Sequence, residues 1–417
     1  MTQVLLFDPH RGGHHLECAS RLQSYIHDID STISIDFLAP EPDEEYDKYF
    51  DAEEISYLFD AGYDSVEKLS AEPAKTRKEL VARTIEHAER EEYDFVHFLQ
   101  LDDLVREVHR YVSDRQPSVE IVGLIVGSYF AAGPVVNRVI SRLLRSRMGE
   151  TIAPLLPEMI NHVGRYRNDQ YMYRAMRDGS LARVFVFSEL ARTYLAELNA
   201  DYAAEQTVVV PDPTELYFTM DISQEAARDH LGLPADDLIL LFFGQMRTEK
   251  GIETLFEAIR RYDGPSFRIV IAGSPTDVSD RDIETLRRQQ VPDVSVVPEY
   301  VPDEELPFYF LAADGVVCPY KRSFGSYRTS NIFQKAAGAA RPIIASNFGI
   351  FADRIQQWDL GQTFEPESPS ALVESFREFV AADGSIGDRE RIEQYARSQT
   401  YRQWGEQTVE QLQNIDS

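Results

Sequence analysis

The sequence predicts an α/β protein with two domains, each built on a parallel β-sheet covered by helices. Short apolar runs alternate with stretches of helical spacing along most of the chain, which is typical of parallel sheets with crossover helices. At 417 residues, the chain is too long for one ordinary hydrophobic core. Near the middle, residues 208–213 contain two prolines that stiffen the backbone and indicate a linker.

The first half of the chain contains the strands of the first predicted domain. They are expected at residues 3–8, 34–38, 93–99, 119–126 and 183–187. Residues 75–90 and most of 134–180 have the spacing of helices. Residues 40–60 are acidic and aromatic, which indicates an insertion or loop.

The second half repeats the strand–helix pattern of a parallel sheet. Its strands are expected at residues 238–243, 267–272, 294–297, 314–318 and 342–346. The tail, residues 398–417, has the pattern of a polar helix that contains Trp404.

The composition is strongly acidic. The chain has 70 acidic against 42 basic residues, a formal net charge of −28, and only seven of the bases are lysines. An acid-rich, lysine-poor surface is favoured in a salt-rich cytoplasm, where ions screen the self-repulsion of the protein. We therefore expect a salt-adapted source such as a halophilic archaeon; the alternative is an ordinary acidic protein. Such a charge argues against nonspecific binding to nucleic acid.

The cysteines and the chain start indicate a cytoplasmic protein. Cys18 and Cys318 are the only cysteines, and they lack the spacing of a zinc site. The first strand begins at once, without the basic and apolar regions of a signal peptide. No apolar run reaches the ~18 residues that a membrane-spanning helix needs.

The most informative segment is residues 238–251, where an apolar strand ends at Gly244 and a helix begins near residue 252. The loop between strand and helix contains Arg247 and Lys250. In a parallel sheet, ligands bind at the carboxyl ends of the strands, and two cations beside a helix start suit a diphosphate. The alternative is an ordinary strand–loop–helix unit with two solvated charges.

This segment resembles the donor-site loop of the GT-B glycosyltransferases of family 4, the group 1 transferases. Other segments resemble that family in the same order along the chain: VFVFSELARTYL, VVVPDPTEL, FRIVIAGSP, VPEYVPDEELPFYFLAADGVVCPY and AAGAARPIIASNFG. The resemblance implies two Rossmann-like domains that face each other across a cleft. It assigns acceptor binding to residues 1–210, nucleotide-sugar binding to 211–397, and a helix that crosses back to the first domain to 398–417.

The implied activity is transfer of a sugar from a nucleotide-diphosphate sugar to a glycan or lipid-linked acceptor, with retention of the anomeric configuration. The nucleotide sugar is a co-substrate, and no metal or other cofactor is expected. The leaving diphosphate, held by cations, can itself accept the acceptor's proton. Two other functions stay open, a catalytically inactive GT-B protein that acts as a binding or scaffold partner and a sugar-nucleotide epimerase.

The resemblance also implies which residues bind the donor. Gly244 is assigned to the nucleotide, and the family's arginine is found two residues after Gln245, at Arg247, where it binds the diphosphate with Lys250. A second diphosphate contact is expected at the start of a later helix, where backbone amides are free; the alternative is a plain capped helix. The residues of this contact are Thr329, Ser330 and Asn331.

The chain departs from the family's Glu-x7-Glu motif. The two glutamate positions hold Tyr327 and Lys335, which puts the ribose contact in doubt and motivates the inactive alternative, although Lys335 stays assigned to the nucleotide. Glu299 and Tyr300 are expected near the nucleotide base, with Tyr300 packed under its loop rather than stacked on the base. Gly273 is expected to allow close backbone approach.

The first strand is followed by a loop that faces the cleft in this fold. Gly12 and Gly13 let backbone amides approach a ligand, and His14 is a candidate acid–base group or phosphate contact; the alternative is a solvated loop histidine. Asp102 follows a later strand in a cleft-facing loop and is the second catalytic candidate. His97 is expected in the core or in the cleft wall.

Residues 134–183 contain nine arginines against four acidic residues, although the rest of the chain is strongly acidic. Val and Leu recur at helical spacing beside Arg138, Arg142 and Arg145. A basic amphipathic helix suits an anionic membrane surface or a lipid-phosphate acceptor, so peripheral binding to the cytoplasmic face of a membrane is expected. The alternative is a helix packed on the domain with solvated arginines.

Overall fold

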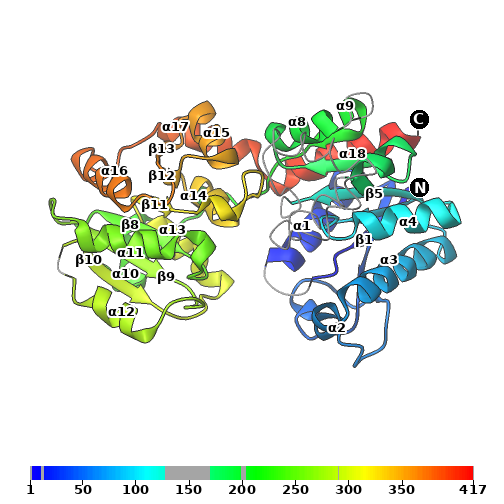
Figure 1. The fold of residues 1–417 in the computed structure, drawn as a ribbon, viewed down its shortest axis with the longest axis horizontal. Coiled ribbons are helices and arrows are strands. Elements are labelled where there is room, and N and C mark those ends of the chain that lie inside the picture. Colours follow the sequence, from blue (N-terminus) through cyan, green and yellow to red (C-terminus); the bar gives the residue numbers. More distant parts are fainter. Residues whose placement is uncertain (1, 11–13, 127–169, 199–202, 290, 417) are drawn as a thin grey trace, which may run out of the picture. The chain divides into compact units, whose positions relative to one another are not determined.

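The computed structural model describes residues 2–10, 14–126, 170–198, 203–289 and 291–416. The chain divides into two compact units, one formed by Met1–Pro211 with Tyr401–Ser417 and the other by Asp212–Thr400. Each unit contains one parallel β-sheet with helices packed on it (Figure 1). The predicted fold class, α/β with two parallel-sheet domains, is confirmed.

The first unit has a seven-stranded sheet with the order β3-β2-β1-β4-β5-β6-β7. Its strands are β1 (Thr2–Phe7), β2 (Ile33–Ala39), β3 (Ile55–Tyr57), β4 (Phe95–Phe98), β5 (Glu120–Ile125), β6 (Arg183–Val186) and β7 (Thr207–Val209). Its helices include α1 (His14–Ile29), α2 (Ser65–Ala71), α3 (Pro73–Arg90), α4 (Val105–Arg115), α8 (Glu189–Leu198), α9 (Ala203–Gln206) and α18 (Tyr401–Asp416). The expected loop at 40–60 contains edge strand β3, and strand β7 occupies the start of the expected linker.

One face of this sheet is covered by helices from opposite ends of the chain. Val4 and Leu6 of β1 belong to a hydrophobic cluster that also contains Trp404 of α18. Helices α1 and α18 pack against each other (Figure 1), and the Trp404 ring lies 6.1 Å from the ring of Phe187. The C-terminal helix is therefore part of the core of the first unit.

The second unit has a six-stranded sheet with the order β10-β9-β8-β11-β12-β13. Its strands are β8 (Ile239–Phe243), β9 (Arg268–Ala272), β10 (Asp293–Val297), β11 (Gly315–Cys318), β12 (Ile343–Ser346) and β13 (Gly361–Phe364). Its α-helices are α10 (Gln224–His230), α11 (Ile252–Arg261), α12 (Asp280–Arg287), α13 (Leu306–Ala312), α14 (Asn331–Gly338), α15 (Gly349–Trp358), α16 (Pro369–Ala381) and α17 (Arg389–Ser398). In the described part of the chain, no helix is long and apolar enough to cross a membrane.

Strand β8 shows why the sequence predicts the central strands well. Leu241 and Phe243 enter one hydrophobic cluster, and Leu240 and Phe242 enter the cluster on the opposite face, because successive side chains of a strand point to opposite faces. A strand buried on both faces is a continuous apolar run. Strand β13 is short, polar in its middle and at the sheet edge, and it was not predicted.

Both sheets reverse their strand order at one place. In the first unit the reversal lies between β1 and β4, and in the second unit it lies between β8 and β11. At such a point the connections leave in opposite directions, so the carboxyl ends of the two strands border a crevice where ligands bind. The topology therefore selects the loops after β1 and after β8 as candidate sites.

The second unit begins with a buried ionic contact. The carboxylate of Asp212 accepts hydrogen bonds from Arg354 Nη1 and Gln334 Nε2, both at 2.6 Å, and Asp212 and Arg354 are almost fully buried. The backbone N–H of Asp212 donates to Gln399 Oε1 at 2.9 Å. These bonds attach the first residue of the unit to helices α14 and α15.

Replacing Arg354 with methionine should strongly destabilise the second unit, because it leaves the Asp212 carboxylate buried without its charged partner. We expect the free energy of unfolding to fall by about 3–5 kcal/mol. The double variant Asp212→Asn/Arg354→Met removes both charges and should lose less. Urea denaturation followed by circular dichroism measures both values, and an equal or larger loss in the double variant would contradict this account of the pair.

Candidate functional site

The loop after β8 is pinned against the loop after β11. Gly251, which precedes α11, has a φ of 73°, and a Cβ atom there would lie 1.7 Å from the carbonyl oxygen of Pro319. Only glycine fits such a left-handed, crowded position. A Cβ atom on Gly244 would lie 2.8 Å from Lys250 Nζ and 3.6 Å from Ile332 Cδ1. The loop after β8, its lysine and the first turn of α14 therefore meet at the point where the strand order reverses.

Three cations surround this point, with one carboxylate between two of them. Glu249 lies 3.3 Å from Arg247 Nη2 and 3.3 Å from Arg328 Nη1. Burial, together with the nearby charges of Arg247 and Arg328, lowers the pKa of Lys250 to about 8. Arg247 Nε is buried and has no hydrogen-bond partner among the described residues. The local charge is positive, which suits an anionic ligand. Arg328 was missed because the sequence shows neither its direction nor its neighbours.

The start of α14 borders these cations. Ser330 caps the helix by accepting a hydrogen bond from the N–H of Phe333 at 3.4 Å, and its hydroxyl also contacts Tyr320 Oη at 2.8 Å. The N–H groups of Asn331 and Ile332 precede that of Phe333. They belong to the first turn, where backbone N–H groups have no acceptor within the helix. Thr329 and Asn331 are half-buried. The capped-helix alternative thus holds for Ser330, and the free first turn still faces the loop after β8.

Lys335 points into the unit. It is buried, and its Nζ donates a hydrogen bond to Tyr217 Oη at 3.0 Å and lies 5.5 Å from the centroid of that ring. Tyr217 itself belongs to the hydrophobic core. Tyr327, at the other glutamate position, is also buried. The Lys335 ammonium is therefore directed toward Tyr217 in the core.

The expected base contacts lie on the surface. Tyr300 is 68% exposed and does not pack under its loop, which corrects that expectation. Glu299 is exposed as well. Gly273 has a φ of 137°, and a Cβ atom there would lie 2.2 Å from the carbonyl oxygen of Gly244. The backbone that approaches Gly273 is therefore that of Gly244, so this glycine lets two loops of the site pack together.

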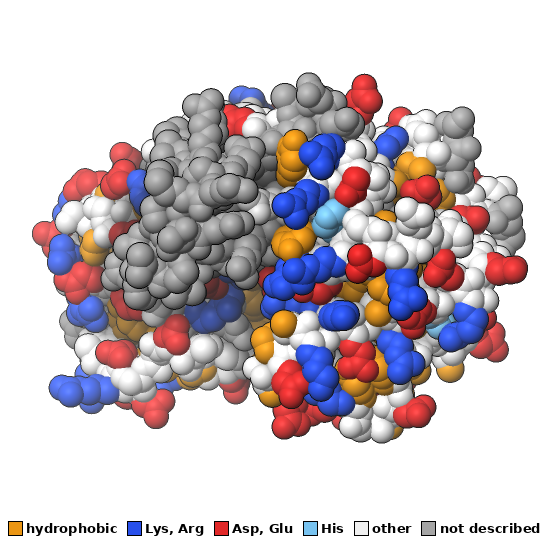
Figure 2. Space-filling view, turned by 45° about the vertical axis from the view of Figure 1, so that its right-hand side comes forward, with side chains coloured by type: hydrophobic (Ala, Val, Ile, Leu, Met, Phe, Trp, Pro, Cys, Tyr) orange, Lys and Arg blue, Asp and Glu red, His pale blue; other side chains and the backbone are white. Residues whose placement is uncertain are grey.

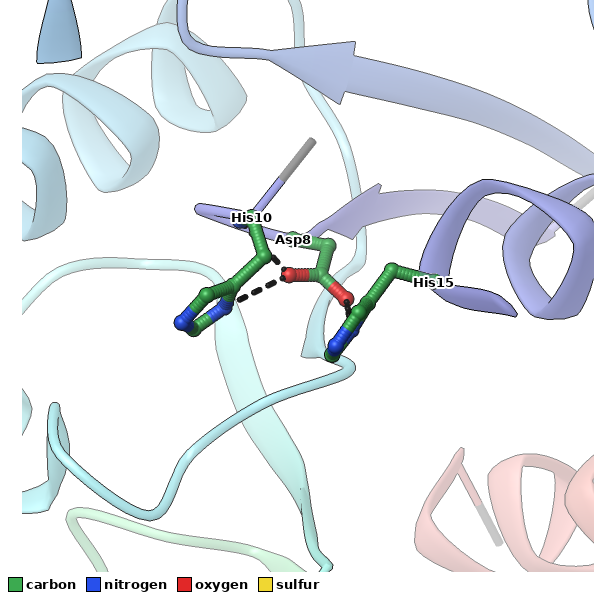
Figure 3. A group of neighbouring side chains, drawn as sticks. All are labelled: Asp8, His10 and His15. Carbon is green, nitrogen blue, oxygen red and sulfur yellow. Dashed lines mark hydrogen bonds and ion pairs between the residues drawn. The ribbon is translucent and has the colours of Figure 1, made fainter. Parts of the chain in front are cut away.

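In the first unit, a carboxylate and two histidines gather at the end of β1 (Figure 3). Asp8 is 2% exposed and accepts hydrogen bonds from His10 Nδ1 at 3.2 Å and His15 Nδ1 at 3.0 Å. The two imidazole rings are stacked, with centroids 5.1 Å apart. Burial alone would raise the pKa of Asp8, but the hydrogen bonds and charges of the two histidines hold it well below its usual range. This group was not predicted from the sequence, although the order Asp-x-His directly after a strand is a usable signal.

The candidates predicted in the first unit have different surroundings. Asp102 is buried, and its carboxylate accepts the N–H of Val126 at 2.8 Å, so it orders a backbone segment and acts on His10 through its charge. His97 lies in the core against Phe185, and burial lowers its pKa to about 3. His14 is the first residue of α1, but its side chain lies outside the described residues. Two predicted groups of residues also lie outside them: Gly12 and Gly13, and Arg138, Arg142 and Arg145.

The described end of the arginine-rich segment contains Arg174, Arg177 and Arg183. Arg174 lies 5.8 Å from the ring centroid of Tyr171, and Arg177 lies 5.3 Å from that of Tyr173. Arg110 of α4 donates a hydrogen bond to Tyr171 Oη at 2.9 Å. On the face drawn in Figure 2, Lys and Arg side chains are interspersed with acidic side chains. In this described part, arginines pack on aromatic rings of the first unit.

Part of the second unit matches a known protein family. Residues 223–399 match the protein family described as "Glycosyl transferases group 1". A D-inositol 3-phosphate glycosyltransferase from Xylanimonas cellulosilytica is 28% identical over 207 residues, 47% of this chain and 46% of that protein. A GDP-mannose:glycolipid 4-beta-D-mannosyltransferase from Xanthomonas campestris is 29% identical over 147 residues, 34% of this chain and 40% of that protein. The chain thus matches less than half the length of these two bacterial relatives.

Solved structures share the fold over the whole chain. Sucrose-phosphate synthase from Thermosynechococcus elongatus has a TM-score of 0.68 at 18% identity and covers 100% of this chain and 99% of its own. The Anabaena protein HepE, in complex with UDP and glucose, has a TM-score of 0.67 at 13% identity and covers 99% of this chain and 100% of its own. The protein therefore has the GT-B fold, and most of its second unit matches the group 1 glycosyl transferases.

Proposed function

We propose that the protein is a glycosyltransferase that takes a sugar from a nucleotide-diphosphate sugar. The observation that carries the proposal is the group of Arg247, Lys250 and Arg328 beside the free first turn of α14, where the strand order of the second unit reverses. A diphosphate is the ligand chemistry that fixed cations and helix amides suit together. The relative named for GDP-mannose, and HepE structures solved with UDP or UDP-glucose, support a nucleotide-sugar donor.

The reaction retains the anomeric configuration and needs no metal at the donor diphosphate. The three cations stabilise the negative charge that develops on the leaving diphosphate. A diphosphate oxygen held in this way accepts the proton of the attacking acceptor hydroxyl, and the new glycosidic bond forms on the same face. In this scheme the donor itself supplies the base, so a separate catalytic base in the first unit is not required.

The acceptor binds to the first unit, at the crevice beside β1 and β4. A lipid-linked or glycan acceptor on the cytoplasmic side of a membrane is our proposal for its class. The arginine-rich segment 134–183 supports an anionic partner by composition, and one relative is named for a glycolipid acceptor. The low lysine content supports a salt-adapted source.

An inactive GT-B scaffold protein is the second candidate. Tyr327 and Lys335 favour it, because they stand at the two glutamate positions of the Glu-x7-Glu motif of the group 1 transferases and both are buried. Nucleoside diphosphates separate the two candidates, since a scaffold without a donor site gains no thermal stability from them, whereas a ligand at saturating excess raises stability.

Replacing Arg247 or Lys250 with alanine should weaken catalysis strongly, because each substitution removes a preorganised charge from the leaving diphosphate. We expect a loss of roughly 2–4 kcal/mol of transition-state stabilisation for each. Donor turnover by the purified protein measures it. Arg260→Ala is the matched control, because Arg260 is an exposed arginine of the same unit that pairs with Glu257. Turnover close to wild type in both site variants would refute the assignment.

Affinity for the nucleoside diphosphate should fall as the pH rises above about 8, because the ammonium of Lys250 then loses its proton. The decline should approach tenfold per unit of pH at most, the limit for one titrating group. Calorimetric titration from about pH 7 to about pH 9 measures it. The variant Lys250→Arg stays charged over this range and should show a flat profile. A wild-type profile as flat as that of the variant would exclude Lys250 from the site.

The melting temperature should rise with salt, because the formal charge of −28 repels itself in dilute buffer. At molar KCl the Debye length is ~3 Å, so this repulsion is screened. Each ~1 kcal/mol of stability gained corresponds to roughly 2–4 °C for a domain of this size. Sucrose at equal osmolality is the uncharged control. A melting temperature that is unchanged or lower in KCl would contradict adaptation to salt.

A further inference from the structure

The group formed by Asp8, His10 and His15 has the composition of a transition-metal site. Two imidazoles and one carboxylate are a common ligand set for divalent ions such as Zn²⁺, with further positions left open. One ligand atom from each residue lies within 4.8 Å of the other two. The sequence predicted no metal, because this spacing across a strand end and a helix start matches none of the usual cysteine and histidine patterns.

The distances between the nitrogen and oxygen atoms of the group are close to those between ligand atoms around a bound ion. The two Nδ1 atoms lie 3.2 Å and 3.0 Å from the two carboxylate oxygens (Figure 3). Tetrahedral ligands at about 2.0–2.1 Å from an ion lie ~3.3 Å from one another. The carboxylate–imidazole separations already match this value, so the ion mainly requires the two rings to turn toward a common point. Each neutral ring can free its Nδ1 by carrying its proton on Nε2 instead.

The surroundings favour a cation and give it access. Asp8 is almost fully buried, whereas the side chains of His10 and His15 are 45% and 23% exposed, so an ion enters from the histidine side. Asp102 and Asp103 also act electrostatically on His10, and Asp103 is paired with Arg77 at 3.4 Å. With neutral imidazoles the group carries net negative charge. Such a charge is stabilised by a bound divalent ion.

The position of the group gives an ion a use. Asp8 directly follows β1, at the reversal of strand order between β1 and β4, where ligands of the first unit bind. We infer that Asp8, His10 and His15 bind one divalent transition-metal ion, which keeps an open position for an oxygen atom of a ligand of the first unit. This inference does not depend on the proposed sugar transfer.

The test measures metal binding directly, with the full chain stripped of metal by a chelator. Equilibrium dialysis against Zn²⁺, with excess Mg²⁺ and high salt to suppress binding by surface carboxylates, should give about one Zn²⁺ per chain. Co²⁺ in its place should give the visible absorption of a site with nitrogen ligands. Replacing His10 or His15 with alanine should weaken Zn²⁺ binding at least roughly tenfold, as loss of even a supporting group does in metal sites.

His230→Ala is the control, because His230 is a similarly exposed histidine of the second unit that pairs with Glu305. It should bind Zn²⁺ like the wild type. The two site variants replace partly exposed side chains, and thermal unfolding checks that they fold. If wild type takes up no Zn²⁺ under these conditions, or if both site variants bind it as wild type does, the three residues form a hydrogen-bonded group only. Nucleoside diphosphate binding, measured on the same preparations, tests the second unit separately.

Discussion

The reversal of strand order in each parallel sheet is the constraint on which the candidate sites depend. Within each sheet all strands run in the same direction, so the loops that leave their carboxyl ends lie at one edge of that sheet. The loop after β8 carries Gly251, and the loop after β11 carries Pro319. A side chain at Gly251 would collide with the backbone of Pro319, so glycine lets the two loops pack together. The same edge in the first unit gathers Asp8 and two histidines. Fold and site chemistry therefore share one cause.

The candidate site of the second unit is positively charged, although the chain as a whole is strongly acidic. Acidic residues outnumber basic ones by 70 to 42, and the chain keeps only seven lysines. Lys250 is nevertheless held in a position that lowers its pKa, between Arg247 and Arg328. Three cations around one carboxylate repel one another, and Glu249 compensates only part of that repulsion. An anionic ligand relieves the remainder, which is a physical reason to find such a cluster in a binding site.

The sequence predicted what local patterns determine. Apolar runs located the central strands, and a strand–glycine–cation order located Arg247 and Lys250. It missed β3, β7 and β13, which are edge strands of only three or four residues and give too short a pattern to be recognised. It also missed Arg328, because its partner Glu249 is distant in sequence. It missed the Asp8 group although its three residues lie in one short stretch of the sequence. For Gly273 and Tyr300 the sequence indicated conformation and residue type, but the contact partner and the exposure came from tertiary packing.

Helix α14 explains why Lys335 differs in role from the residues at its start. Thr214 Oγ1 donates to the carbonyl oxygen of Gln334 at 3.0 Å, and Gln334 Nε2 donates to Asp212. A few residues later, Tyr217 accepts the hydrogen bond of Lys335. The first segment of the second unit thus packs along the middle of the helix and takes up its polar side chains. Its first turn lies beside the loop after β8. Because one face of the helix is fixed by the entering chain, the direction of its first amides is fixed as well, so the proposed diphosphate would meet a preorganised end rather than a mobile one.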